Sequence, residues 1–234
     1  MTHFNNILTL NRMDLPLFIA ISISIISFLI YWAFYISSNG QGRLVIRARF
    51  IGFILFAVLP VGMLILFTNF HVDDIGLILV PESGKFIFIS SFLLSVIGIF
   101  VTVINPGSVK HFKKYPQIRD PKWSKQIFIW NLISWAVYLT GYEILFRGVI
   151  LFTTAASVGV LPAIAISTGF YSAFHLQKGF FEAVGAIFLG LLLSFFTIMS
   201  GSIWIAVIVH VTMGVSNTLW SFKHHPEMSM KESM

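Results

Sequence analysis

The chain has 234 residues, of which 57% are hydrophobic and 10% are charged, whereas a soluble domain has about 25% charged residues. Several apolar runs approach or exceed the roughly 18 residues of a spanning helix, so the composition excludes an ordinary soluble domain and predicts an integral membrane protein. The net charge of +6 does not predict nucleic acid as a partner, because the basic residues lie between the apolar runs, and the absence of Cys excludes disulfides and thiol catalysis.

Apolar segments separated by clusters of Gly, Pro, Asn and charged residues predict an all-α, polytopic transmembrane helical bundle with about seven spans. We expect the spans at about 16–36, 50–70, 86–104, within 123–156, and at 160–176, 180–199 and 202–221.

The distribution of Lys and Arg predicts the orientation of these spans. With seven spans, twelve basic residues fall on one side, which should be the cytoplasmic side: Arg43, Arg47, Arg49, Lys110, Lys113, Lys114, Arg119, Lys122, Lys125, Lys178, Lys223 and Lys231. We therefore expect the N-terminus outside, the C-terminus inside, and a multi-pass protein among membrane lipids (in the plasma membrane for a bacterial source).

The fourth segment is too long for a single straight span. A helix of 35 residues would be about 52 Å long at 1.5 Å per residue, whereas the hydrocarbon core is about 30 Å thick. We expect Asp120 to about Ser134 to form an interfacial or projecting helix, with Trp123 and Trp130 as interface anchors and entry into the bilayer near Trp135.

Charged and ionisable residues inside the later spans are candidates for a functional site, because they are costly in lipid. Glu143 and Arg147 are four residues apart, so they share one helical face and could also be a pair that only fixes packing. His175 and His210 each lie alone in a later span. Glu182 begins the sixth span, where it either complements the helix dipole or reaches the polar site.

Three short patterns follow one another in this part of the chain. They are Glu143-x-x-x-Arg147-Gly148, then Tyr171-x-x-x-His175, then Gly201-Ser202-Ile203-Trp204 followed by His210. Together they resemble the CPBP superfamily of intramembrane endopeptidases, which includes CAAX endopeptidases and proteins of bacteriocin processing and immunity. The resemblance covers roughly Ser124 to Leu219. It implies N-terminal membrane helices over 1–122, a protease core over 123–221 and a polar cytoplasmic tail over 222–234.

The chain departs from the family pattern at several positions. The family has two adjacent Glu residues, of which the first generally activates the water, and here that first position is Tyr142. The aromatic residue before the first His is usually Phe and is Tyr171 here. The Asn or Asp that usually lies four residues after the last His is replaced by Gly214, and the nearest amide is Asn217, two turns beyond His210.

By this resemblance, the chain would hydrolyse peptide bonds of protein or peptide substrates with an activated water. The catalytic residues would be Glu143, Arg147, His175 and His210, with Tyr142, Glu182 and Asn217 as accessory candidates. Glu143 or Glu182 would supply the carboxylate, the two His would handle the water and the oxyanion, and Arg147 would hold Glu143. There is no His-Glu-x-x-His motif, so we expect neither a metal nor another cofactor.

Two other functions stay open at this stage. The loss of the first Glu and of the Asn favours a non-catalytic membrane adaptor or immunity-type protein on the same scaffold. Intramembrane His and Glu would also suit a small transporter or proton relay, although the chain lacks visible repeats.

Overall fold

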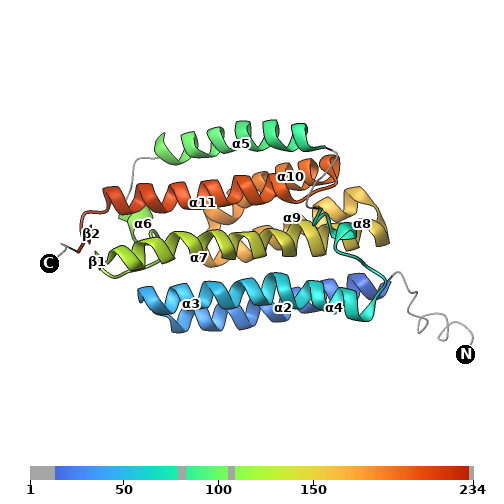
Figure 1. Cartoon of the computed structure of the whole chain (residues 1–234), viewed down its shortest axis with the longest axis horizontal. Helices are drawn as coiled ribbons and strands as arrows, with labels where there is room; N and C mark the ends of the chain where they lie inside the picture. Colours follow the sequence, from blue (N-terminus) through green and yellow to red (C-terminus); the bar gives the residue numbers. More distant parts are fainter. Residues whose placement is uncertain (1–13, 79–82, 105–108, 232–234) are drawn as a thin grey trace, which may run out of the picture.

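A computed structural model describes residues 14–78, 83–104 and 109–231. Long helices run side by side along one axis, with the start of the first helix and the end of the last helix at opposite ends of the bundle (Figure 1). The helices are α2 (Asp14–Ser37), α3 (Gly42–Phe53), η1 (Ile54–Val58), α4 (Leu59–Phe67), η2 (Asp73–Ile75), α5 (Gly84–Ile104), α6 (Val109–Phe112), α7 (Lys125–Glu143), η3 (Ile144–Ile150), α8 (Leu151–Val158), α9 (Val160–His175), η4 (Leu176–Lys178), α10 (Phe180–Ser200) and α11 (Trp204–His224). The predicted all-α, polytopic bundle is confirmed.

Six helical stretches in the described part of the chain are long and apolar enough to cross a bilayer: Leu15–Ser37, Gly42–Phe67, Gly84–Ile104, Lys125–Val158, Phe180–Ser200 and Trp204–His224. The remaining expected span corresponds to α9, which has only 16 residues. At 1.5 Å per residue α9 is about 24 Å long, which is less than the hydrocarbon core of about 30 Å. In the described chain, six helical stretches are thus long enough to span a bilayer, and the shorter α9 packs against α8 and α10.

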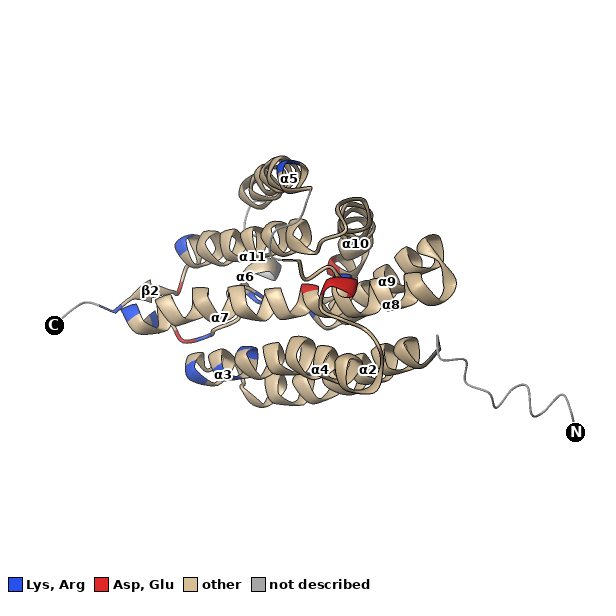
Figure 2. Cartoon of the chain, turned by 45° about the vertical axis from the view of Figure 1, so that its right-hand side comes forward, with Lys and Arg blue, Asp and Glu red and all other residues tan. Residues whose placement is uncertain are grey.

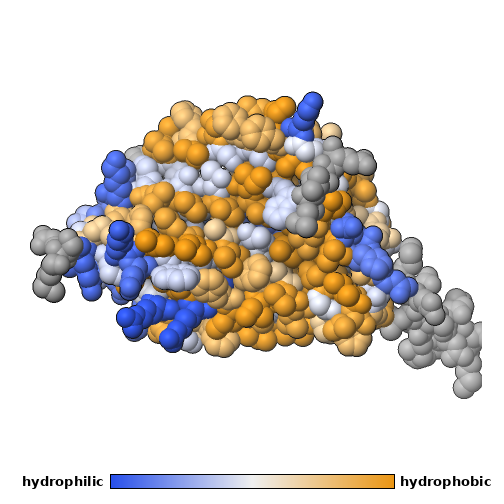
Figure 3. Space-filling view, viewed as in Figure 1, coloured by the Kyte–Doolittle hydropathy of each residue, from blue (hydrophilic) through white to orange (hydrophobic). Residues whose placement is uncertain are grey.

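The outer surface has the polarity expected of a membrane protein. Apolar side chains cover the middle of the face seen in Figure 3, and hydrophilic side chains gather toward its ends. Lys and Arg are concentrated at the end of the bundle that carries the C-terminus, around the start of α3 and the end of α11 (Figure 2). The cytoplasmic location of this basic end stays a prediction from its charge.

The second span begins earlier than the sequence suggested. Helix α3 begins at Gly42 and continues through η1 and α4, so Arg43, Arg47 and Arg49 lie on a helix and not in a loop. Arg43 and Arg47 are exposed, whereas Arg49 is buried. The burial of Arg49 was not expected from its place in a basic cluster. Its polar partners lie far along the chain, so the local sequence does not reveal them.

The expectation of a helix from Asp120 was wrong. Residues 118–121 are not helical, and α7 begins at Lys125, after Ser124 accepts a hydrogen bond from the Ile127 amide at 3.2 Å. From Lys125 the helix continues unbroken through η3 and α8 for 34 residues. Its first turns pack against α3 and α11, with Trp130 against Phe50 and Phe128 against Phe222.

Trp123 is not an interface anchor, because its side chain is fully buried. It lies in strand β1 (Lys122–Trp123), which pairs in parallel with β2 (Ser229–Met230). Its ring centroid is 4.6 Å from that of Phe222. Part of the segment 222–234, which we expected to be a polar tail, therefore packs onto the start of the predicted protease core at Trp123. Trp130 is half exposed and remains a candidate anchor.

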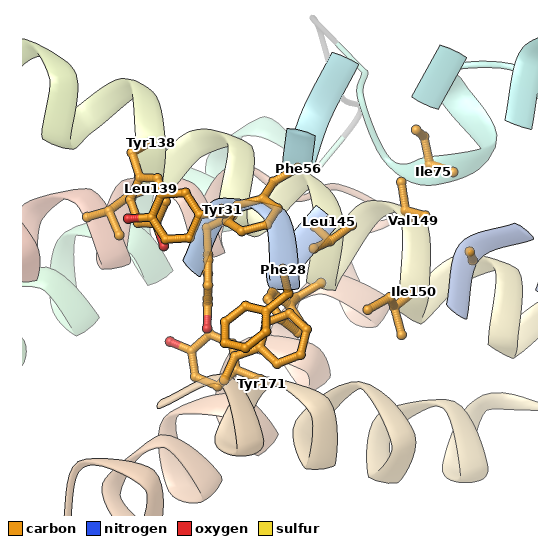
Figure 4. Packing of buried hydrophobic residues seen from close by; sticks show 14 of the residues in the cluster. Phe28, Tyr31, Phe56, Ile75, Tyr138, Leu139, Leu145, Val149, Ile150 and Tyr171 are labelled. Atoms are coloured by element: carbon orange, nitrogen blue, oxygen red, sulfur yellow. The ribbon is translucent and has the colours of Figure 1, made fainter. Parts of the chain in front are cut away.

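The helix formed by α7, η3 and α8 is the centre of the bundle. Its most apolar window is 78% buried, against 39% or less for the other five spans. An aromatic cluster fixes it against α2 and η1, with Tyr31 stacked on Tyr138 at 4.9 Å and close to Phe56 (Figure 4). Tyr142 follows Tyr138 one turn later and continues the cluster toward the polar residues.

Candidate active site

The polar site is built around the junction between α7 and η3. Glu143 is the last residue of α7, and the π-helical segment η3 follows at once and carries Arg147. π-Helical turns are rare and occur frequently at functional sites. Both side chains are fully buried, and Arg147 Nη1 lies 3.2 Å from Glu143 Oε2. Glu143 and Arg147 therefore form an ion pair in the protein interior.

Arg147 is held by more than its carboxylate. Its guanidinium lies 4.0 Å from the centre of the Tyr171 ring, and its Nη2 donates to the Gly190 carbonyl at 3.4 Å. The neighbouring Gly148 is needed for close packing, because a Cβ there would lie 3.2 Å from the Ile75 carbonyl oxygen. These contacts connect η3 to α9, α10 and the loop containing η2.

Glu143 also binds His210 of α11. His210 Nδ1 lies 2.5 Å from Glu143 Oε1, so Nδ1 carries a proton that it donates to the carboxylate. Both carboxylate oxygens are thus engaged, one with His210 and one with Arg147. A carboxylate held in this way fixes the tautomer and the orientation of the imidazole, as in other His–carboxylate pairs.

His175 of α9 is oriented by its own helix. Its Nδ1 lies 2.8 Å from the Tyr171 carbonyl oxygen, which can only accept, so Nδ1–H is the donor. The hydroxyl of Tyr142 lies 3.2 Å from the same nitrogen. A neutral His175 therefore has its lone pair on Nε2, which leaves Nε2 available as a base.

The two imidazoles face a common cavity. Their ring centroids are 6.4 Å apart, and both rings line a cavity of about 510 Å³. Within the described residues, neither Nε2 atom has a hydrogen-bond partner, and neither is among the fully buried unpaired atoms. Both Nε2 atoms are therefore accessible from the cavity, whereas Glu143 and Arg147 lie behind its wall.

The wider part of the cavity carries further polar groups from several elements. Glu182 and Asn217, the accessory candidates, lie on its wall together with His111 and Lys178. Burial lowers the pKa of Lys178, and the nearby Glu182 carboxylate partly opposes this shift. Burial also lowers the pKa of His111, whose Nε2 lies 2.7 Å from the Ser221 hydroxyl.

The structure brings Glu143, Arg147, His175 and His210 close together, and Tyr142 joins them through His175. Their catalytic roles stay a prediction. Over residues 14–78, 83–104 and 109–231, no group of three or more His, Cys, Asp or Glu side chains is placed to hold a metal ion.

Trp135 is a wall residue whose role the sequence did not indicate. A Cβ on Gly214 would lie 2.8 Å from Trp135 Nε1, so the indole occupies the space next to the position where the family usually has an amide or acid. Nε1 is buried and has no partner among the described residues. Gly214, four positions after His210, was the one sign in the sequence, because a residue without a side chain leaves room for a large neighbour such as Trp135.

Residues 123–216 match the model of a protein family described as type II CAAX prenyl endopeptidase Rce1-like. This match confirms the resemblance over less than half of the chain, and it covers α7, η3, α8, α9, α10 and the part of α11 that carries His210. Neither a curated protein nor a solved structure matches the chain. The matched segment is thus CAAX-protease-like, in a chain that has the apolar helices of an integral membrane protein.

Proposed function

We propose that this protein is an intramembrane endopeptidase that hydrolyses peptide bonds of protein or peptide substrates in the cavity between His175 and His210. The observation that carries the proposal is the pair of imidazoles that share one cavity, each with Nδ1 occupied and Nε2 accessible. The family match supports the reaction class, because its printed description is that of an endopeptidase.

In the first step, His175 acts as the general base. Its Nε2 takes a proton from a water whose oxygen attacks the carbonyl carbon of the scissile bond. The carbonyl π bond becomes an oxyanion, which a protonated His210 stabilises by donating its Nε2–H. In the second step, the carbonyl re-forms and the C–N bond breaks as His175 gives its proton to the leaving amine. The products are a carboxylic acid and an amine, and the acid then loses its proton to solvent.

Glu143 and Arg147 act through His210 in this mechanism and do not touch the substrate. The carboxylate accepts the Nδ1–H of His210 and fixes the orientation of its ring, and Arg147 holds the carboxylate in place through the ion pair in the apolar interior. This places Glu143 as a positioning residue, in contrast to the water-activating Glu that the family has at the position of Tyr142. Glu182 is the carboxylate that lies on the cavity wall and could compete with His175 for the role of base.

Cleavage of internally quenched CAAX-type peptides, with and without a prenyl group, by the purified protein in lipid nanodiscs would test the proposal. His175→Asn should lower the rate about 10²–10⁴-fold, as is typical for loss of a general base. Glu182→Gln should leave most of the activity, and His224→Asn, a change of an exposed His on the same helix as His210, is the control. Full activity of His175→Asn would exclude this mechanism, and a large loss in Glu182→Gln would move the base to Glu182.

A non-catalytic membrane adaptor is the second candidate. It is favoured by one observation, namely that Tyr142 replaces the usual first Glu while both oxygens of Glu143 are engaged. If the wild-type protein binds the same peptides but leaves them intact over a day, the adaptor function replaces the protease function.

A further inference from the structure

A second, smaller cavity lies at the basic end of the bundle. Its volume is about 210 Å³, which is below the roughly 300 Å³ at which drug-sized pockets begin, so it suits a small group. Four cationic side chains line it, and no Asp or Glu does. The four are Lys113, Lys114, Arg119 and Lys178.

The walls of this cavity also offer neutral hydrogen-bond donors. Tyr31 and Tyr35 of α2 and Tyr138 of α7 contribute phenol groups, and Gln117 and Gln177 contribute amides. Burial lowers the pKa of Lys178 and of Arg119, so these two positive charges are already partly deprived of water, whereas Lys113 and Lys114 are exposed. An anion in the cavity would favour both charged forms.

A fifth cation, Arg49, lies directly behind the wall. Gln117 lines the cavity, and its Oε1 accepts a hydrogen bond from Arg49 Nη2 at 3.0 Å. Arg49 is 1% exposed, its Nε has no partner, and no carboxylate of the described chain forms an ion pair with it. A buried charge without a counter-charge is costly unless something else supplies one.

We propose that this cavity is a binding site for a phosphate group, carried either by the headgroup of an anionic lipid or by free inorganic phosphate. The cluster of Lys donors and Tyr hydroxyls fits the several acceptor oxygens of a phosphate. The guanidinium of Arg119 adds a fixed positive charge to the wall, because its Nη1 and Nη2 donate to the carbonyls of Phe112 and Lys113. Glu182 lies on the wall of the neighbouring hydrolytic cavity and compensates at most one of these charges. Lys114 and Lys178 line both cavities, so the bound anion would lie next to the proposed hydrolytic site.

The test measures the thermal unfolding midpoint, Tm, by intrinsic Trp fluorescence and needs no activity, so its result is independent of the proposed hydrolysis. One arm titrates inorganic phosphate against chloride at equal ionic strength in phosphatidylcholine nanodiscs. The other arm replaces part of the phosphatidylcholine with phosphatidylglycerol in chloride. We expect Tm to rise by about 5–10 °C at saturation in at least one arm. A rise with phosphate identifies free phosphate, and a rise with phosphatidylglycerol alone identifies a lipid headgroup.

The double variant Lys113→Gln/Lys178→Gln should lose most of this rise. Arg47→Gln is the matched control, because Arg47 is an exposed cation of α3 at the same end of the bundle and does not line the cavity, so the rise should persist. The proposal is overturned if neither probe raises Tm above the chloride reference. It is also overturned if the double variant keeps the full rise, or if Arg47→Gln loses as much of it as the double variant does.

Discussion

Two arginines are buried completely in this bundle, and their surroundings differ in one respect. Arg147 lies 4.0 Å over the ring of Tyr171, and Arg49 lies 4.4 Å over the ring of Trp135. Arg147 faces the carboxylate of Glu143, whereas the hydrogen bonds of Arg49 within the described residues go to neutral oxygens. In the first region Arg147 thus has a counter-charge within the chain. The second leaves a net positive charge, which an anion from outside the chain can balance.

The strongest way to test this comparison is to remove the internal counter-charge. Glu143→Gln keeps the size of the side chain but leaves Arg147 buried without a partner, so we expect a loss of about 3–5 kcal/mol in unfolding free energy. Chemical unfolding in nanodiscs, followed by Trp fluorescence, would measure it. Glu182→Gln is the control, because Glu182 is partly exposed and forms no ion pair in the described structure, and it should change stability by about 1 kcal/mol or less. Equal effects of the two changes would contradict the internal balance.

The next prediction concerns Trp135, which lies between the two regions. Its ring stacks on Arg49, and its Nε1 lies next to Gly214, one turn beyond His210. A Cβ at position 214 would lie 2.8 Å from this nitrogen and 2.5 Å from Leu139 Cδ1. Gly214→Ala should therefore destabilise the protein by about 1–3 kcal/mol through overpacking, as measured by the same unfolding assay.

A matched control exists on the facing wall of the cavity. Gly185 of α10 has no atom within 4 Å of the position that its Cβ would take. Gly185→Ala should therefore stabilise the helix by up to about 1 kcal/mol, since Ala is the better helix former. If Gly214→Ala were as stable as Gly185→Ala, the packing of Trp135 against position 214 would not be as close as the structure indicates.

The same two arginines show what the sequence could and could not predict. Glu143 and Arg147 are neighbours on one helix, so helical periodicity alone placed them together. His175 and His210 joined them because unpaired polar groups are costly in hydrocarbon, which favours a shared site. Their tautomers were not predictable, because these depend on the Tyr171 carbonyl and on one particular carboxylate oxygen.

Arg49 gave no comparable signal. Its partners Gln117, Asn131 and Ser134 are 68, 82 and 85 residues away, and no periodicity connects positions so far apart. The sequence placed it in a basic loop, since charge clusters next to apolar runs usually lie at membrane surfaces. Trp123 was misplaced for a related reason, because its partner Phe222 lies 99 positions later, beyond the end of the protease-like segment.

The last and smallest expected effect is the coupling between the two arginine regions, measured by a double-mutant cycle of Arg49→Gln and Glu143→Gln in chloride. Arg49 and Glu143 share no hydrogen-bond or ion-pair partner, so their effects on unfolding free energy should add within about 0.5 kcal/mol. A deviation of more than about 1 kcal/mol would show that the two regions form one charge network through the apolar interior. In that case Arg49 would sense the charge of the Glu143–Arg147 pair, and part of its counter-charge would come from within the chain. Additivity, by contrast, leaves Arg49 dependent on an external anion.

The cycle can then be repeated with saturating phosphate or with phosphatidylglycerol. The loss of unfolding free energy caused by Arg49→Gln should increase, while the loss caused by Glu143→Gln stays the same.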